Sequence, residues 1–92
     1  MSNAPAYLSA PMLAPPHQRP AEALHALAVH LRQRGIRDLY GAACSRFGVL
    51  SLPEVSVWTN GRVLWWRAGD EETSWPAADA PGAARRLASL IV

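Results

Sequence analysis

The chain has 92 residues with a formal net charge of +2 at pH 7, and all nine of its basic residues are arginine. Its length allows one domain, and no apolar run approaches the roughly twenty residues of a membrane-spanning helix. The weak charge does not by itself indicate nucleic-acid binding. The single cysteine excludes a disulfide within the chain and favours a reducing, cytoplasmic setting.

Residues 1–19 are predicted to form a disordered, proline-rich arm. Five prolines fall within the first twenty residues, and each fixes φ, removes a backbone donor and disfavours helix at the preceding residue. The segment also lacks the charged start and continuous apolar run of a signal peptide, which again favours a cytoplasmic protein. Residues 20–92 are expected to form one α+β domain.

The first predicted helix spans Pro20 to Arg34. Proline suits the first helical position, because its missing N–H would have no partner there. Apolar residues follow at i, i+3, i+4 and i+7, which places them on one face of the helix. They are Leu24, Leu27, Ala28 and Leu31. Gly35 then favours a left-handed end to the helix, with Ile36 placed to contact Leu31 in a Schellman motif.

Residues 38–46 are ambiguous, and a short edge strand is favoured over an irregular helical turn. An antiparallel meander is predicted over residues 47–76, and Asp79 is expected to cap a second helix. The apolar stripe of that helix is Ala84, Leu87, Ala88 and Ile91. The expected fold is therefore α+β, with a three- to four-stranded antiparallel meander and an N-terminal and a C-terminal helix packed on one face.

Three connections set the expected register of the meander. Asn60-Gly61 predicts a two-residue hairpin turn, which pairs Trp58 with Val63. Gly69-Asp70 predicts a second tight turn, which sets Arg67 opposite Glu72 in a favourable charge pair. The connection at Pro53-Glu54 is expected to be wider than two residues, because proline cannot make a primed turn.

These registers divide the side chains between two faces of the sheet. One face is an entirely apolar layer on which the helices are expected to pack. Its members are Leu50, Leu52, Val55, Val57, Leu64, Trp66 and Trp75. The other face carries Trp58, Val63 and Trp65 among polar residues, where an ordinary solvent-facing sheet would be polar.

The tryptophan-bearing face is the predicted interaction surface, because two short helices cannot cover both sides of a sheet and exposed apolar patches mark interaction sites. Three explanations remain open. The surface is a homodimer seam, it binds another macromolecule, or the N-terminal arm folds over it. The arm residues suited to that last role are Tyr7, Leu8, Met12 and Leu13.

Residues that could carry catalysis or bind a metal do not form a recognisable set. His25 and His30 lie about 140° apart around the helix, whereas zinc-binding pairs prefer i and i+4, and His17 lies in the arm. Cys44 is predicted to be a small, buried and inert apolar residue. No glycine-rich phosphate loop is present. We therefore expect no catalytic residues, no metal site, no cofactor and no enzymatic activity.

The arginines offer candidate nucleic-acid contacts, because arginine beside exposed aromatic rings often holds single strands. The candidates are Arg62, Arg67, Arg32, Arg34, Arg37 and Arg46. The simpler interpretation is that they are helix-end and sheet-edge charges. The favoured function is a small non-enzymatic protein-interaction or regulatory module that uses the tryptophan-bearing face and self-associates, with a homodimer or another protein as its partner. A nucleic-acid-binding regulator and a non-catalytic subunit that completes an enzyme are the alternatives.

The C-terminal third of the chain carries three linked segments: NGRVLWWR at 60–67, WPAAD at 75–79 and GAARRL at 82–87. Together they resemble a recurring pattern in short uncharacterised proteins of high-GC bacteria. The resemblance implies a cytoplasmic bacterial protein, and it implies no activity and no site residue.

Overall fold

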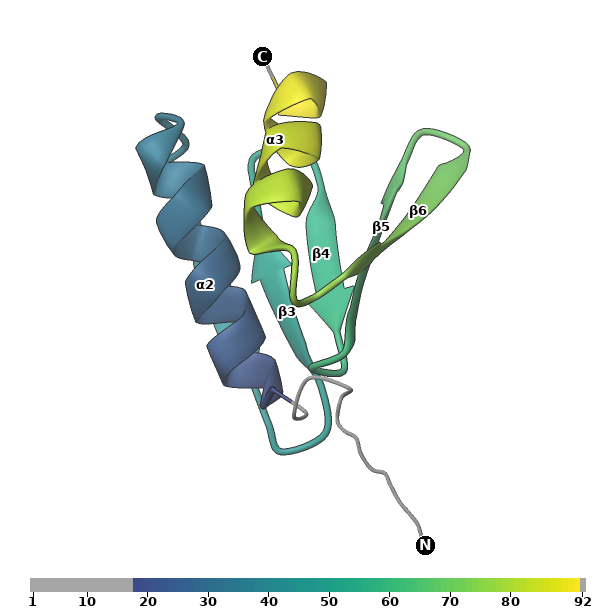
Figure 1. Cartoon of the computed structure of the whole chain (residues 1–92). Coiled ribbons are helices and arrows are strands. Elements are labelled where there is room, and N and C mark those ends of the chain that lie inside the picture. Colours follow the sequence, from purple (N-terminus) through teal and green to yellow (C-terminus); the bar gives the residue numbers. More distant parts are fainter. Residues whose placement is uncertain (1–17, 92) are drawn as a thin grey trace, which may run out of the picture.

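Residues 18–91 are described by the computed structural model, and they form a five-stranded antiparallel sheet with two helices on one face (Figure 1). The sheet order follows the chain, β2-β3-β4-β5-β6. The elements are α2 (Pro20–Gln33), β2 (Tyr40–Ala43), β3 (Gly48–Ser51), β4 (Ser56–Thr59), β5 (Val63–Ala68), β6 (Glu71–Pro76) and α3 (Ala80–Ile91).

The predicted α+β class and the placement of both helices on one face are confirmed. The sheet has five strands rather than three or four, because the ambiguous segment over residues 38–46 contains the outer strand β2. The predicted arm lies outside the described residues, apart from Gln18 and Arg19.

Helix α2 begins and ends as its sequence predicts. The Arg19 N–H donates to Glu22 Oε1 at 3.0 Å, which satisfies one donor at the start of the helix. All four residues of the predicted stripe are buried. At the other end Gly35 has a φ of 90°, and the Ile36 N–H donates to Leu31 O at 3.1 Å. This is the 6→1 hydrogen bond of a Schellman motif.

Asp79 caps helix α3 as predicted. Its Oδ1 accepts the Gly82 N–H at 3.2 Å, and its Oδ2 accepts the indole N–H of Trp75 at 2.9 Å. A Cβ at position 82 would collide with the Asp79 carboxylate, so glycine lets the cap approach the first turn closely. The carboxylate therefore ties the start of α3 to strand β6.

The β5–β6 register matches its prediction and the β4–β5 register does not. Arg67 pairs with Glu72 across the β5–β6 hairpin, and their charged groups lie 3.7 Å apart. In β4–β5, Trp58 lies opposite Trp65 rather than Val63. The error is a shift of two residues, so every side chain keeps its predicted face.

Side-chain hydrogen bonds in the β4–β5 loop explain the shift. The buried Thr59 hydroxyl accepts the Gly61 N–H at 2.9 Å and donates to Val63 O at 2.8 Å. Asn60 Oδ1 accepts the N–H groups of Arg62 and Val63 at 2.9 and 3.0 Å. These bonds satisfy the backbone of a loop longer than a two-residue turn.

The β3–β4 connection is shorter than predicted. The Leu52 N–H donates to Val55 O at 2.8 Å, which leaves only Pro53 and Glu54 between them. The donor of the hydrogen bond that closes this turn is the Leu52 N–H. Proline at position 53, which has no N–H, is therefore compatible with a two-residue connection.

The apolar layer predicted for one face forms the core beneath the helices. Six of its seven residues are buried, and Trp75 is partly buried. The rings of Trp66 and Trp75 stack with centroids 6.4 Å apart. The β5–β6 hairpin projects beyond the two helices, which explains why Trp75 keeps some exposure (Figure 1).

We expect Trp66→Ala to lower the free energy of unfolding by about 3–5 kcal/mol, because it removes a large buried side chain and leaves a cavity. Trp66 is 1% exposed, whereas Trp58 is 42% exposed. The matched change Trp58→Ala should lower the same quantity by only about 1 kcal/mol. Urea unfolding followed by circular dichroism measures both, and equal losses would contradict the assignment of the two faces.

The Asp79 cap predicts a pH dependence. The hydrogen bond from Trp75, helped by the Gly82 N–H, lowers the pKa of Asp79. A lowered pKa contributes stability that is present above the unfolded-state value of about 3.9 and is lost as pH falls through the folded-state value. Between about pH 5 and pH 2, Asp79→Asn should therefore lose less unfolding free energy than the wild type. Asp70→Asn, in the β5–β6 turn, is the control, and equal pH slopes for all three proteins would refute this role.

Candidate functional site

The candidate site is the face of the sheet turned away from the helices, which we call the Trp face and define by Trp58, Val63 and Trp65. Trp58 is exposed, and Val63 and Trp65 are partly buried. Their strand neighbours Val57 and Leu64 are fully buried beneath the helices, so alternation places the three on the opposite side.

The observed register brings the two tryptophans closer than the sequence predicts. Trp58 and Trp65 are direct cross-strand partners, and Val63 lies on the diagonal from Trp58. Directly opposed residues have Cβ atoms about 4.5–5.5 Å apart, so the two indoles form one contiguous surface.

Three further apolar residues extend this surface and were missed from the sequence. Val49 lies opposite Trp58 on β3, Phe47 is 50% exposed, and Tyr40 on β2 is 77% exposed. Alternation from Leu50 would have placed Val49 on the Trp face. Tyr40 carried no such signal, because its exposure depends on β2 being the outermost strand.

Two shallow hollows flank Trp58. The first, about 290 Å³ in volume, is lined by Ser56, Trp58, Trp65, Trp66, Arg67 and Glu72. The second, about 270 Å³, is lined by Ala42, Ala43, Cys44, Phe47, Gly48, Val49 and Trp58. Trp58 is therefore a ridge between two depressions, a shape that suits side chains projecting from another surface.

The six candidate arginines do not converge on the Trp face. Arg67 lies beside the tryptophans, but its guanidinium is 3.7 Å from the Glu72 carboxylate. Arg46 and Arg62 lie in loops at the end of the molecule where α2 begins. This placement follows from two glycines of the same loops: Gly61 lies against the Gln18 backbone, and Gly48 lies against the Leu24 side chain.

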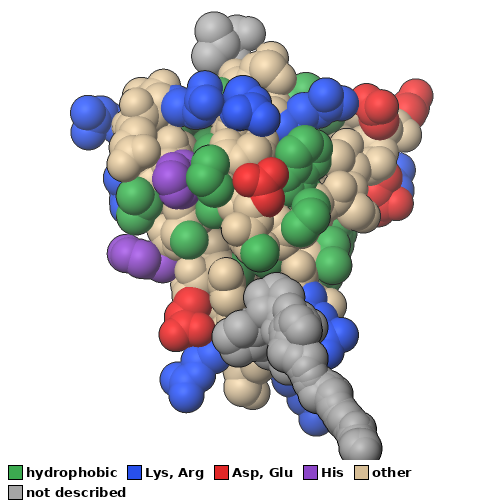
Figure 2. All heavy atoms as spheres, viewed as in Figure 1, with side chains coloured by type: hydrophobic (Ala, Val, Ile, Leu, Met, Phe, Trp, Pro, Cys, Tyr) green, Lys and Arg blue, Asp and Glu red, His purple; other side chains and the backbone are tan. Residues whose placement is uncertain are grey.

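The other three arginines, Arg32, Arg34 and Arg37, lie at and beyond the far end of α2. Figure 2 shows arginine side chains at both ends of the helix-bearing side, with acidic side chains at the tip of the β5–β6 hairpin. The arginines therefore do not form one continuous cationic surface beside the aromatic rings.

Cys44 is exposed, so the prediction that it is buried is wrong. It follows β2, whose four residues are all exposed, and apolar neighbours on an outer strand do not bury it. Hydrogen bonds from the backbone of Arg46 and Phe47 lower the pKa of its thiol. Over residues 18–91, no group of three His, Cys, Asp or Glu side chains is placed to hold a metal ion.

Comparison with known proteins finds no protein-family model, no curated protein and no solved structure that matches this chain. None of the helices in the described part of the chain is long and apolar enough to cross a membrane. The resemblance to short bacterial proteins stays a prediction.

The lowered pKa of Cys44 predicts faster alkylation near neutral pH, because the thiolate is the reactive form. We expect the rate of reaction with iodoacetamide to rise with pH around a midpoint below that of an ordinary thiol, because the pKa of Cys44 is lowered. Mass spectrometry of quenched samples measures it. The urea-unfolded chain is the control and should return to the ordinary midpoint, whereas identical midpoints would contradict the backbone effect.

Proposed function

We propose that this chain is a small non-enzymatic interaction module of the cytoplasm that self-associates by burying its Trp face against a second copy of the chain. The observation that carries the proposal is the exposed Trp58 directly opposite Trp65, on the side of the sheet without helices. Both helices are committed to the opposite face, so no helix of the described chain is left to cover this one.

The exposed tryptophan surface supplies a driving force for association. Trp58 keeps 42% of its surface exposed, which is about 100 Å² of a side chain that can bury up to about 250 Å². At about 25 cal/mol per Å², covering it would contribute about 2.5 kcal/mol. Trp65, Val63 and Val49 would add to this amount.

The chemistry around the tryptophans also supports a protein partner. Polar residues surround the apolar centre, with Ser56 on one side and the Arg67–Glu72 ion pair on another. An apolar centre rich in tryptophan within a polar rim is typical of protein–protein interfaces. A nucleic-acid strand would need cationic groups along the rings, and here the guanidinium of Arg67, which lies beside them, is paired with the Glu72 carboxylate.

Self-association is supported by the size of the domain. A domain of about seventy residues buries a small core and often gains stability from a partner subunit. In this chain one face of the sheet contributes almost nothing to that core. A second copy that covers the Trp face would add the missing layer.

Trp58→Ser and Trp65→Ser should weaken self-association at least about tenfold, because each removes a central aromatic contact worth about 1.4 kcal/mol or more. Light scattering and sedimentation over a range of concentrations measure this, with circular dichroism to show that the fold is kept. Leu90→Ser on α3 is the matched control, because Leu90 is 40% exposed and lies on the helix side.

Three results would contradict the proposal. Unfolding of Trp65→Ser would show that Trp65 is a core residue. Unchanged association of both variants would show that other surfaces join the copies. Binding of a single-stranded oligonucleotide that weakens steeply as salt rises would favour the nucleic-acid alternative instead.

A further inference from the structure

We infer that the outer edge of β2 pairs with β2 of a second copy, so that two five-stranded sheets join into one sheet of ten strands. This contact goes beyond the proposed function, because it uses backbone groups at the rim of the sheet rather than the Trp face. Three observations carry it: an open row of backbone groups, the absence of edge protection, and a self-complementary register.

The open row follows from the hydrogen bonds of β2. The Cys44 N–H donates to Phe47 O at 2.9 Å, so the backbone groups of residue 44 point towards β3. Hydrogen-bonding direction alternates along an antiparallel strand, so Ala42 also points inwards, while Gly41 and Ala43 point outwards. Within residues 18–91 no strand pairs with that outer side.

The two edges of the sheet are protected unequally. The outer strand β6 carries Glu71, Glu72 and Pro76, and charged residues and proline are common guards against strand pairing. The other outer strand, β2, has the sequence Tyr-Gly-Ala-Ala, and all four of its residues are exposed. It carries no charge and no proline, and its one bulky side chain, Tyr40, lies on the Trp-face side by the strand register.

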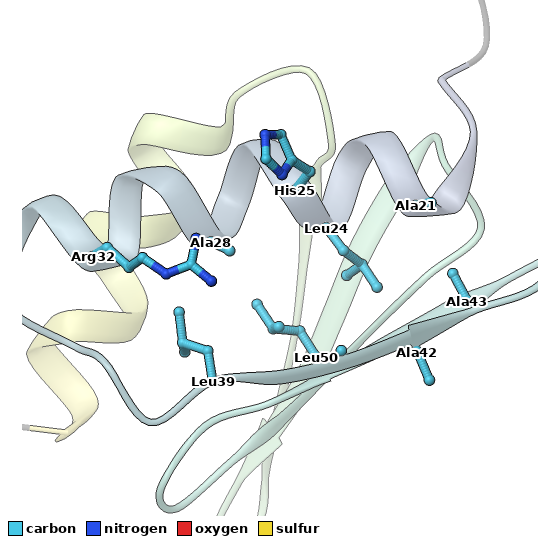
Figure 3. A pocket seen from close by; sticks show the side chains of 10 residues that line it. Ala21, Leu24, His25, Ala28, Arg32, Leu39, Ala42, Ala43 and Leu50 are labelled. Atoms are coloured by element: carbon cyan, nitrogen blue, oxygen red, sulfur yellow. The ribbon is translucent and has the colours of Figure 1, made fainter.

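Helix α2 lies over one face of β2 and forms no backbone hydrogen bond with it in residues 18–91. A hollow of about 260 Å³ lies between the helix and that face of the strand. Figure 3 shows Leu24 and Ala28 on the helix side of this space, and Leu39 and Leu50 on the sheet side. The residues of β2 that line it are Gly41, Ala42 and Ala43, so α2 covers this face of the strand only in part.

A second copy fits this edge because β2 is complementary to itself. In a continuous sheet, residues opposite each other must have their side chains on the same face. A two-fold axis that passes through Ala42, perpendicular to the sheet, meets this requirement, because it pairs the two β2 strands antiparallel and keeps every side chain on its own face. Gly41 of each copy then pairs with Ala43 of the other, which satisfies the outward N–H and C=O groups of both residues. Beyond the strand ends, Asp38 of one copy faces Arg46 of the other, so opposite charges meet.

Edge pairing would also combine the two Trp faces. Ala42, Val49, Trp58 and Trp65 form one row across four strands of the sheet. A two-fold axis at Ala42 continues this row into the second copy, on the same side of the joined sheet. The edge contact and the Trp-face contact therefore use different atoms, and either can fail without the other.

The first experiment compares Gly41→Pro with Ser74→Pro, both in the Trp58→Ser background, by light scattering at several concentrations. Proline at 41 removes an outward N–H, and a Cβ there would lie 3.4 Å from Leu50 Cδ1, which is ordinary van der Waals contact. Ser74 is its counterpart on β6. The Ala77 N–H donates to Arg62 O, so the backbone groups of residue 77 point towards β5. Because this direction alternates along the strand, the N–H of Ser74 points outwards, as that of Gly41 does on β2.

In that background we expect a dimer for the parent and for Ser74→Pro, and at least a tenfold weaker dimer for Gly41→Pro. A monomeric parent, or equal association of the two proline variants, would overturn edge pairing. Loss of the dimer on Trp58→Ser alone would support the Trp-face seam and refute the edge. Persistence of the dimer would support the edge. The Trp-face contact would then be tested by whether the wild type associates beyond the dimer at concentrations where Trp58→Ser does not, so failures of the two proposals are distinguishable.

The second experiment does not depend on a variant that perturbs the backbone. Ala42→Cys in a Cys44→Ser background places two thiols at the two-fold axis. There, non-hydrogen-bonded partners have Cα atoms about 4.5 Å apart, within disulfide range. We expect rapid disulfide-linked dimer with oxidised glutathione, and at least tenfold slower cross-linking for the matched control Ser74→Cys. Equal rates for the two variants would overturn the register.

Discussion

The packing of both helices against a single face of the sheet is the constraint on which the rest of the structure depends. Val57, Leu64 and Trp66 are buried in that contact. Because side chains alternate along a strand, burying these three commits Trp58 and Trp65 to the other side. An open sheet face is thus a direct consequence of how the core is built. The tryptophans distinguish it from the polar open face of an ordinary sheet.

The β4–β5 hairpin shows why the faces could be predicted when the residue pairs could not. Face assignment needs only the parity of the strand, and a register shift of two residues preserves parity. The pairs depend on the loop, where Thr59 and Asn60 use their side chains to bind backbone groups. Asn-Gly favours a two-residue turn in isolation, but the buried Thr59 hydroxyl needs partners of its own, and the wider loop provides them.

Features set by neighbouring residues were predictable, and features set by position in the sheet were not. The Gly35 helix end and the Asp79 cap depend on contacts three to five residues apart, so the sequence contains all the information they need. The exposure of Tyr40 and Cys44 depends on β2 being the outermost strand. No local pattern distinguishes an outer strand of small residues from a buried one, since both are apolar.

The unequal protection of the two sheet edges is difficult to explain for a domain that stays single. Unguarded edges favour aggregation, and natural sheets commonly guard them with charges, proline or a covering helix. This chain guards β6 with two glutamates and a proline, yet leaves β2 with neither a charge nor a proline. The guarded edge shows that the sequence contains such protection where it is needed. Its absence from β2 therefore indicates that this edge has a partner, and a strand that is complementary to itself needs no other protein to supply one.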